Sequence, residues 1–446
     1  MPSPHDAAPF VIRRPEIDAA GGMLRCVYGH PDFGAFTETV TFPALSDSEA
    51  SHALARLAAI VMGTSYYKAR PTGRIVCDFA LTPAARRLAA LTYGPGLGEF
   101  YVRNALSYPP DLTVEADDAE AAPSGRSAAN DPPRAACAFG GGKDSHVAAA
   151  ILAEAGAEVE RVSAHLSQAV AERLQTMSEE PLTFMQRAID PRLIEISRSG
   201  EALNGHIPIT AINSVLLTLY AEAQGLDWVV FANERAASEA TMEVNGHAVN
   251  HQFSKSLEYE DALRAAFDEA GARAEYFSIL RPVSELWTAH YLATRSGALD
   301  IFASCNRNFV FAGPNALEEG RRWCGACAKC VYTAVLLAPF LSLGGHAAVF
   351  QSRPLHDPAN APFLREIAGL TDAKPWECVG ERREVAAALA HLLTLEDWRE
   401  APLVAGVEAE LLEHWDRQDL EAAWDEALEA RSEHRIPDAV ARVMGA

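Results

Sequence analysis

The sequence predicts an α/β protein: a parallel sheet with helices on both faces, preceded by an α+β unit and followed by a helical region. Between residues 135 and 343, short apolar runs alternate with stretches of helical periodicity, as in βαβ units. An acidic, proline-bearing stretch, EADDAEAAPSGRSAANDPP, separates this part from the N-terminal residues. We therefore expect a domain over 1–112, a linker over 113–134, the parallel-sheet domain over 135–343 and a helical region over 344–446.

Each element follows from local periodicity. Alternating and β-branched residues predict N-terminal strands at 10–13 and 39–42, and apolar spacing predicts a helix over 51–61. Residues beyond about 345 are mostly helical in pattern and acidic. In the middle part the expected strands are 135–139, 158–166, 193–197, 227–232 and 275–279, and the expected helices are 144–155, 210–224 and 284–294.

Composition narrows the class of protein. The formal net charge of the 446 residues is -22, which disfavours a nucleic-acid partner because phosphate backbones are bound by clustered Lys and Arg. Neither a signal pattern nor an apolar run of about 18 residues is evident, so we expect a cytoplasmic protein without a membrane span. Eight cysteines in such a chain indicate thiols or a metal site rather than a disulfide scaffold. The sequence gives no indication of oligomeric state.

The stretch CAFGGGKDSH, residues 137–146, places three glycines between an apolar run and an alanine-rich helix. Ligands of open parallel sheets bind at the carboxyl ends of the strands. A glycine turn there lets backbone N–H groups approach an anion beside a helix N-terminus. The pattern is neither Walker A nor the dinucleotide fingerprint. We expect a phosphate-binding loop; the alternative is an ordinary strand–helix turn capped by Ser or Asp.

This loop resembles the pyrophosphate loop S-G-G-x-D-S of the ATP pyrophosphatase superfamily. The resemblance implies an adenine-nucleotide α-hydrolase-like (HUP) fold, with ATP cleaved between its α and β phosphates. A glycine stands where the pattern has serine, which removes one hydroxyl donor. Asp144 is expected to hold Mg²⁺. The expected nucleotide-binding residues are Gly140, Gly141, Gly142, Lys143, Asp144, Ser145 and, near the ribose and adenine, His165. The alternatives are an exposed Lys143 and a merely packed His165.

Four cysteines form a second pattern. Cys324, Cys327 and Cys330 follow one another at two-residue spacing, and Cys305 lies 19 positions before the first of them. Four thiolates suit a closed tetrahedral zinc site. The same spacing occurs with iron–sulfur clusters, and free thiols remain an alternative. The cluster also resembles that of the deazaguanine nitrile synthases, which pair a pyrophosphate loop with four zinc-binding cysteines.

Three segments that connect strands and helices are richer in polar residues than the fold requires: residues 204–213, 233–239 and 249–258. The second follows the fourth expected strand directly and so lies at the same sheet edge as the glycine loop. Residues 63–68 and 98–104 of the N-terminal part are similarly rich in hydrogen-bonding groups. Together these segments indicate a substrate site.

The set GTSYYKA, GEFYVRNAL, FGGGKDS, NGHIPITAINS, ANERAASE, VNHQFSKSLE, RWCGACAKC and PWECVGE resembles the UDP-N-acetylmuramoyl-L-alanyl-L-glutamate epimerases. The resemblance covers residues from about 60 to 385. It implies ATP- and Mg²⁺-dependent inversion of the terminal L-glutamate of the nucleotide-linked dipeptide, a step toward peptidoglycan. The N-terminal domain is then expected to contact the uridine–sugar portion, because an anchored substrate contributes binding energy at the reacting end.

Inverting an α-carbon requires proton-transfer groups. His251 is the first candidate because histidine titrates near neutral pH. Lys255 is expected to act as the second base or to hold a carboxylate, while Glu234 and Arg235 are expected to bind Mg²⁺ and a carboxylate. A thiol of the cysteine cluster is an alternative base if no metal is bound there.

Other activities fit the glycine loop. ATP-driven amidation or nitrile formation on a small acid is the nearest, and thiolation of tRNA is disfavoured by the net charge. A non-catalytic nucleotide-sensing module would need the loop without the polar segments.

Overall fold

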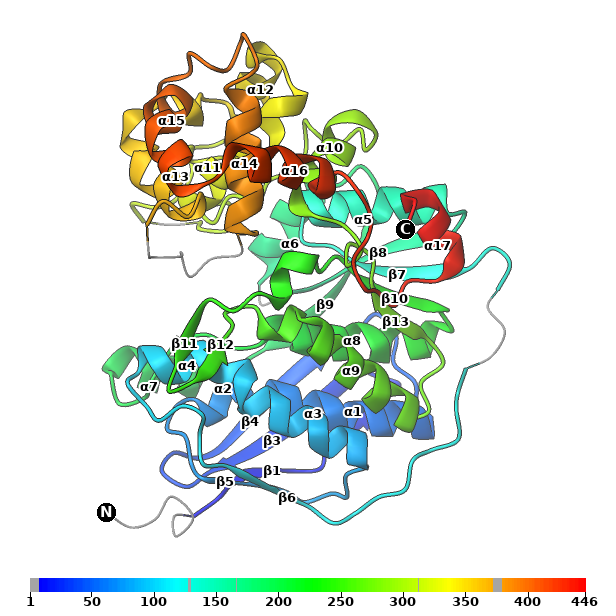
Figure 1. Cartoon of the computed structure of the whole chain (residues 1–446). Coiled ribbons are helices and arrows are strands. Elements are labelled where there is room, and N and C mark those ends of the chain that lie inside the picture. The colour runs from blue at the N-terminus through cyan, green and yellow to red at the C-terminus, as the bar shows by residue number, and fades with distance from the viewer. Residues whose placement is uncertain (1–7, 127–129, 166, 312, 372–378) are drawn as a thin grey trace.

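The computed structural model describes residues 8–126, 130–165, 167–311, 313–371 and 379–446. At its centre lies one mixed eleven-stranded sheet, in the order β13-β10-β7-β8-β9-β4-β3-β1-β5-β6, with β2 paired to β3 (Figure 1). This architecture confirms the predicted α/β class.

One end of the sheet is parallel throughout, as predicted for the middle of the chain. Numbered along the chain, its strands lie in the order 3-2-1-4-5, so the order reverses between β7 and β10. Ligand sites of open α/β sheets lie at such a reversal. The strands are β7 (Arg134–Ala138), β8 (Glu158–His165), β9 (Leu182–Ala188), β10 (Trp228–Phe231) and β13 (Glu275–Ser278).

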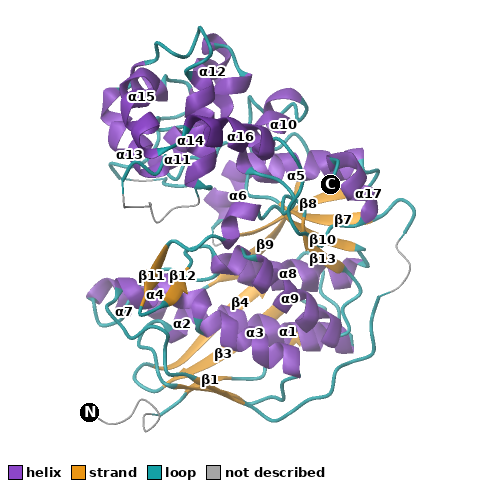
Figure 2. Ribbon diagram, viewed as in Figure 1, coloured by secondary structure: helices purple, strands orange, loops and turns teal. Residues whose placement is uncertain are grey.

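Both faces of the parallel strands are buried. Ala136 and Val229 belong to one hydrophobic core, and the next residues, Cys137 and Val230, belong to the other, as the pleat of a strand requires. Figure 2 shows helices on each side. The first core includes α8 (Ile209–Gln224) and α9 (Leu257–Glu269), and the second includes α5 (Lys143–Glu154) and α10 (Glu285–Thr294).

The strand predicted at 193–197 is wrong: these residues lie in the helix α7 (Pro191–Ser199). The Asp190 side chain accepts a hydrogen bond from the Arg192 N–H, proline occupies the first turn, and Gly200 ends the helix at φ 79°. These are the usual start and stop signals of a helix. The third parallel strand is β9, in which Arg187 occupies a buried position and so interrupts the apolar alternation.

The sheet does not stop at the boundary expected near residue 113. β4 pairs antiparallel with β9, with Thr39 opposite Ala188, so the N-terminal strands extend the parallel ones. The helices of the two parts also contact each other, α1 with α8 and α3 with α9. The N-terminal elements are β1 (Phe10–Ile12), β2 (Glu16–Asp18), β3 (Met23–His30), β4 (Gly34–Thr41), α1 (Glu49–Met62), α2 (Thr64–Tyr67), β5 (Arg74–Cys77), α3 (Pro83–Tyr93) and α4 (Gly98–Arg103).

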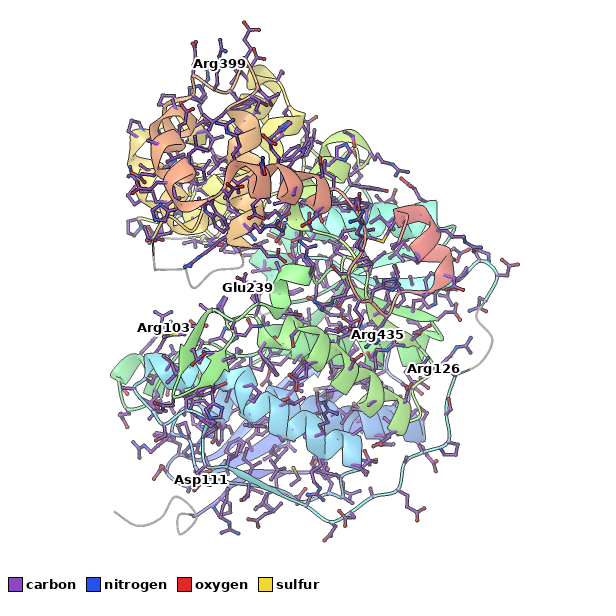
Figure 3. All side chains as sticks on the ribbon, in the orientation of Figure 1. Arg103, Asp111, Arg126, Glu239, Arg399 and Arg435 are labelled. Carbon is purple, nitrogen blue, oxygen red and sulfur yellow. The ribbon has the colours of Figure 1, made fainter. Side chains whose placement is uncertain are left out.

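The stretch expected to be a linker is partly ordered by pairing. β6 (Thr113–Glu115) lies parallel to β5. Further along the same stretch, Arg126 forms an ion pair at 2.7 Å with Asp268 of α9 (Figure 3).

The remainder is helical. The helices from α11 to α16 gather beyond one end of the sheet, and α17 returns to lie against α5 (Figure 1). Among the described residues no helix is long and apolar enough to cross a membrane. The other elements are α6 (Gln168–Gln175), β11 (Met242–Val244), β12 (His247–Val249), α11 (Ala328–Leu337), α12 (Leu343–Phe350), α13 (Ala361–Ile367), α14 (Arg382–Leu392), α15 (Pro402–His414), α16 (Arg417–Ala427) and α17 (Asp438–Met444).

Candidate active site

A cavity of about 580 Å³ lies at the carboxyl ends of β7, β8 and β10, where the strand order reverses. Its position is the one expected for the ligand site of an open α/β sheet. Its polar and glycine lining comes from seven segments far apart in the sequence. The lining includes Gly140, Gly142, Asp144, Ser145, Ser163, Thr210, Asn213, Asn233, Glu234, Lys255, Ser304, Cys305, Asn306 and Lys329.

The glycine loop joins β7 to α5, as predicted. Gly141 has φ +73°, a conformation that favours glycine, and a Cβ there would lie 2.4 Å from the end of the Met177 side chain, which would have to move. A Cβ on Gly140 would meet nothing within 4 Å, because this residue faces open space. The Ser145 hydroxyl donates to the Gly142 carbonyl at 2.9 Å. The loop thus presents bare backbone to the cavity at the start of a twelve-residue helix.

Lys143 is not exposed, so the alternative of an exposed lysine is wrong. Its side chain is fully buried and forms ion pairs with Asp144 and Glu285. Burial opposes its charge, but Asp144, Glu285 and Glu234 outweigh that effect and raise its pKa. The lysine therefore neutralises a carboxylate cluster beneath the glycine loop.

The carboxylate cluster is formed by Asp144, Glu234 and Glu285, which offer oxygen atoms within 4.8 Å of one another. Asp144 and Glu234 also line the cavity. Oxygen ligands of this kind suit Mg²⁺, which binds through one or two carboxylates together with substrate phosphates. The residues present therefore fit the predicted cation.

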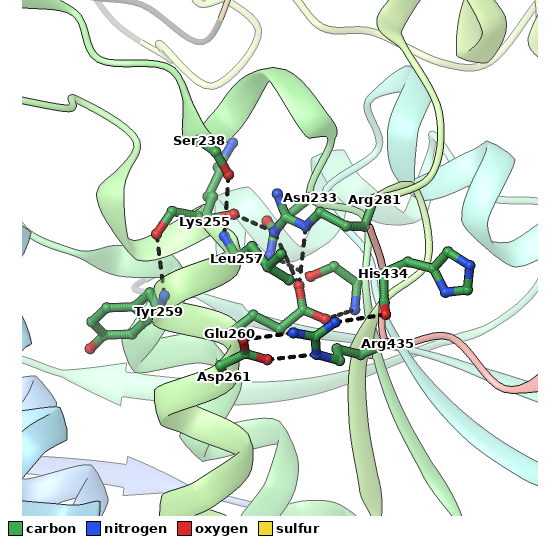
Figure 4. Close-up of polar contacts among 12 residues, drawn as sticks. Asn233, Ser238, Lys255, Leu257, Tyr259, Glu260, Asp261, Arg281, His434 and Arg435 are labelled. Atoms are coloured by element: carbon green, nitrogen blue, oxygen red, sulfur yellow. Dashed lines mark hydrogen bonds and ion pairs between the residues drawn. The ribbon is translucent and has the colours of Figure 1, made fainter. Parts of the chain in front are cut away.

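Glu234 and Lys255 are fixed by one buried arginine. Arg281 donates to the Glu234 carbonyl at 2.7 Å and to the Lys255 carbonyl at 2.5 Å. Its charge is balanced by Glu260, at 3.1 and 3.2 Å (Figure 4). Glu234 and Lys255, both predicted site residues, thus line the cavity while their backbone carbonyls accept hydrogen bonds from the same arginine.

His251, four positions before Lys255 in the chain, lies in a second polar cluster. Glu99 accepts from His251 and pairs with His206 at 3.3 Å, and the two imidazole rings are 5.0 Å apart between centroids. Arg103, at the end of α4, pairs with the other Glu99 oxygen at 3.0 Å (Figure 3). The Glu99 carboxyl is nearly buried, and burial opposes its ionisation, but His251 and Arg103 outweigh that effect and lower its pKa.

His206 is kept neutral by its surroundings. Burial, and then the positive charge of His251, lower the pKa of His206 to about 4. The positive charges of Lys68 and Lys255 lower it further, and Lys255 also lines the cavity. Two imidazole rings that share one carboxylate are groups suited to proton transfer.

Two predicted residues lie elsewhere. The Arg235 guanidinium forms a two-pronged ion pair with Glu381 at 2.9 and 3.1 Å, and Arg235 is outside the set of described residues that line the cavity. His165 contacts the Phe184 ring and lines a separate hollow with Gln168 and Gln186. Ser163 and Ala164, the two residues before it in β8, do line the cavity, but His165 does not.

Sequence reasoning did not single out Glu285, Glu99 or His206. Glu285 is the acidic residue in the first turn of α10, a common feature of helices that carries no functional signal. Glu99 and His206 both fall in polar segments that the sequence indicated. Glu99 contacts His206 and His251, which lie about 107 and 152 positions away in the chain, and contacts over such separations leave no local pattern in the sequence.

The four clustered cysteines also meet. Cys305, Cys324, Cys327 and Cys330 offer sulfur atoms within 4.8 Å of one another, and all four are free thiols. Cys305 lines the cavity as well, so the cluster adjoins the glycine loop.

Comparison with known proteins gives consistent matches over most of the chain. Residues 1–279 match the MurL N-terminal domain and residues 301–422 match the MurL C-terminal domain. Three similar proteins, each named UDP-N-acetyl-alpha-D-muramoyl-L-alanyl-L-glutamate epimerase, come from Salinispora tropica, Micromonospora sp. and Xanthomonas oryzae pv. oryzae. They are 38%, 36% and 35% identical, over 83%, 92% and 98% of this chain and 81%, 91% and 96% of their own lengths.

Proposed function

The chain belongs to the MurL family, and from this premise we propose that it inverts the terminal L-glutamate of UDP-N-acetylmuramoyl-L-alanyl-L-glutamate with the help of ATP and Mg²⁺. The relatives' names support an epimerase of peptidoglycan precursor synthesis. The observation that carries the ATP-dependent mechanism is the cavity itself, which brings the glycine loop together with Asp144, Glu234 and Lys255.

Epimerisation faces a chemical obstacle in this substrate. The α-proton of glutamate is weakly acidic, and removing it next to an ionised carboxylate would create two adjacent negative charges. An ester or anhydride of the same carboxyl group would remove one of those charges. A nucleotide site next to proton-transfer groups offers such activation.

In the proposed reaction the substrate α-carboxylate oxygen attacks the α phosphorus of ATP, and pyrophosphate leaves. A base removes the α-proton from the acyl adenylate, and an acid returns a proton to the opposite face. Water then cleaves the anhydride and releases AMP and the D-glutamyl product. The net change consumes one ATP and one water for each glutamate inverted.

The glycine loop is suited to the phosphates. Gly140 and Gly142 line the cavity without side chains, and the N-terminus of α5 directs its N–H groups toward it. Asp144, Glu234 and Glu285 would hold Mg²⁺, which would balance charge on the departing pyrophosphate. Lys143 balances the same carboxylates.

Proton transfer falls to the cluster around Glu99. Burial lowers the pKa of His206, so this ring is neutral near pH 7, and His251 is hydrogen-bonded to the Glu99 carboxylate; we assign the two imidazoles to the removal and the return of the α-proton. Lys255 lines the cavity, where it can bind the substrate carboxylate. The proposal adds His206 to the His251 and Lys255 that the sequence suggested.

The test is a reaction in D₂O with the dipeptide substrate, ATP and Mg²⁺. We expect D-glutamate with deuterium at the α-carbon, formed together with AMP and pyrophosphate and only when ATP is present. Glutamate inverted without ATP would refute adenylation. ATP cleavage that depends on added ammonia, with glutamate left in the L form, would instead identify an amidating enzyme.

A further inference from the structure

We propose that Cys305, Cys324, Cys327 and Cys330 bind one zinc ion, and that this centre fixes the segment that supports the glycine loop. The two parts rest on separate observations. The first concerns the sulfur atoms and the second concerns hydrogen bonds from residues 303–304.

The spacing of the sulfur atoms fits one ion. The Cys324 and Cys330 sulfurs are 3.6 Å apart, too far for a disulfide bond and close to the roughly 3.8 Å expected for two thiolates on a tetrahedral zinc with bonds of about 2.3 Å. All four sulfurs lie within 4.8 Å of one another. An iron–sulfur cluster needs room for its own iron and sulfide atoms between the thiolates, so this set is too compact for one.

Backbone amides point at the sulfurs. The Cys324 and Arg307 N–H groups both donate to the Cys305 sulfur at 3.4 Å, and the Ala326 N–H donates to the Cys324 sulfur at 3.5 Å. Such donors favour the thiolate, which is the form that binds a metal. The loops around the cysteines thus stabilise thiolates at Cys305 and Cys324, and a divalent cation would balance the charge of the cluster.

The same segment holds the glycine loop. The Ala303 N–H donates to the Gly141 carbonyl at 2.9 Å, and the Ser304 hydroxyl accepts from the Lys143 N–H at 3.3 Å. Cys305 follows directly in the chain and lines the same cavity. On the other side of the cluster, α11 begins just after Cys327 and places Lys329 in the cavity lining. Loss of the ion would therefore release two parts of the cavity lining, residues 303–305 and the start of α11.

The first test is the metal content of the full-length protein, measured by mass spectrometry after dialysis. We expect about one zinc per chain in the unaltered protein and much less in Cys305→Ser. Cys26→Ala, which removes a buried cysteine far from the cluster, should keep its zinc. Iron, or no stoichiometric metal in the unaltered protein, would overturn the proposal.

Cobalt substitution tests the ligands without relying on a variant that folds poorly. Protein refilled with Co²⁺ should show a thiolate-to-cobalt charge-transfer band and intense tetrahedral d–d bands. Weak octahedral bands without charge transfer would show that the cysteines are not the ligands.

The second part rests on the proposed nucleotide site and has its own measurement. Binding of α,β-methylene-ATP with Mg²⁺ should be at least tenfold weaker in Cys305→Ser than in Cys26→Ala. Equal affinity for the analogue in the two variants, with zinc absent from Cys305→Ser, would overturn the link between zinc and the glycine loop but not the metal site itself. Failure of the unaltered protein to bind the analogue would refute the nucleotide site and with it the coupling, whatever the zinc content.

Discussion

Arg281 and Glu260 form a buried ion pair whose guanidinium also donates to the carbonyls of Glu234 and Lys255. Neither residue of the pair lines the cavity. Their effect on it passes through two backbone carbonyls, because the rigid fork of arginine can serve several acceptors at once. Figure 4 shows this arrangement at the base of α9.

Arg281→Lys should lower kcat by at least tenfold while leaving most of the protein folded. Lysine keeps a positive charge for Glu260 but lacks the fork that reaches both carbonyls. The measurements are steady-state rates and the urea midpoint. As a control, Arg295→Lys changes an exposed arginine that pairs with Glu154, and its rates should stay within twofold. Arg281→Met should unfold more readily by about 3–5 kcal/mol, since it leaves Glu260 buried and unpaired.

Glu285→Gln should raise the Mg²⁺ concentration needed for half-maximal pyrophosphate release and lower the maximal rate. The variant removes one of three oxygen ligands and one partner of Lys143. Asp144→Asn should have the stronger effect, because Asp144 lines the cavity directly. Pyrophosphate release titrated with Mg²⁺ is the measurement, and the exposed Asp118→Asn is the control. An unchanged Mg²⁺ requirement in both variants would place the cation elsewhere.

His206→Asn and His251→Asn should each slow epimerisation by roughly 10²–10⁴-fold, the usual contribution of a general acid or base. AMP should still form, since the adenylation site is intact. The decisive quantity is the deuterium incorporated at the α-carbon per AMP released, which should fall in both variants. His52→Asn changes an exposed histidine of α1 and should leave that ratio unaltered. A fall in AMP formation that matched the fall in deuterium would argue for a binding role.

Stability should decrease as the pH falls from about 6.5 toward 4, in part because of His346. Burial lowers the pKa of this histidine to about 4, and its ring donates to the Ala334 carbonyl at 3.0 Å. In that pH range the unfolded chain binds a proton that the folded protein does not, so the free energy of unfolding rises with pH. Each such histidine contributes up to about 1.4 kcal/mol per pH unit.

His346→Asn should make this dependence shallower by up to one proton. The measurement is the free energy of unfolding in urea at pH 7, 6 and 5. His52→Asn serves again as the control because its histidine is exposed. A slope in His346→Asn as steep as in the unaltered protein would show that other groups account for the acid sensitivity.

The sequence was most informative where structure is local. The strand, glycine loop and helix between residues 135 and 155 follow one another in the chain, so their periodicity and turn residues suffice to place them. The carboxyl-end position of the cavity then followed from the alternation of strands and helices. The meeting of the four cysteines was predictable in the same way, because three of them share one short segment.

Contacts between distant segments could not be predicted in this way. The pairing of β4 with β9 joins residues about 149 positions apart, and a buried Arg187 in β9 hides the alternation that marks a strand. Glu38 explains how that arginine is tolerated, since the two form a buried ion pair at 2.7 Å. The burial of Lys143 could not be predicted for a similar reason: its partner Glu285 lies 142 positions away.

The junction of β4 with β9 bears on how the protein can be divided. A shortened protein starting at residue 135 would keep the glycine loop but would expose the flank of β9 as an unprotected edge strand. Arg187 would lose Glu38, and the bare N–H and C=O groups of Gln186 to Ala188 would be free to pair with another chain. Such a fragment should aggregate rather than fold as a stand-alone ATP-binding module.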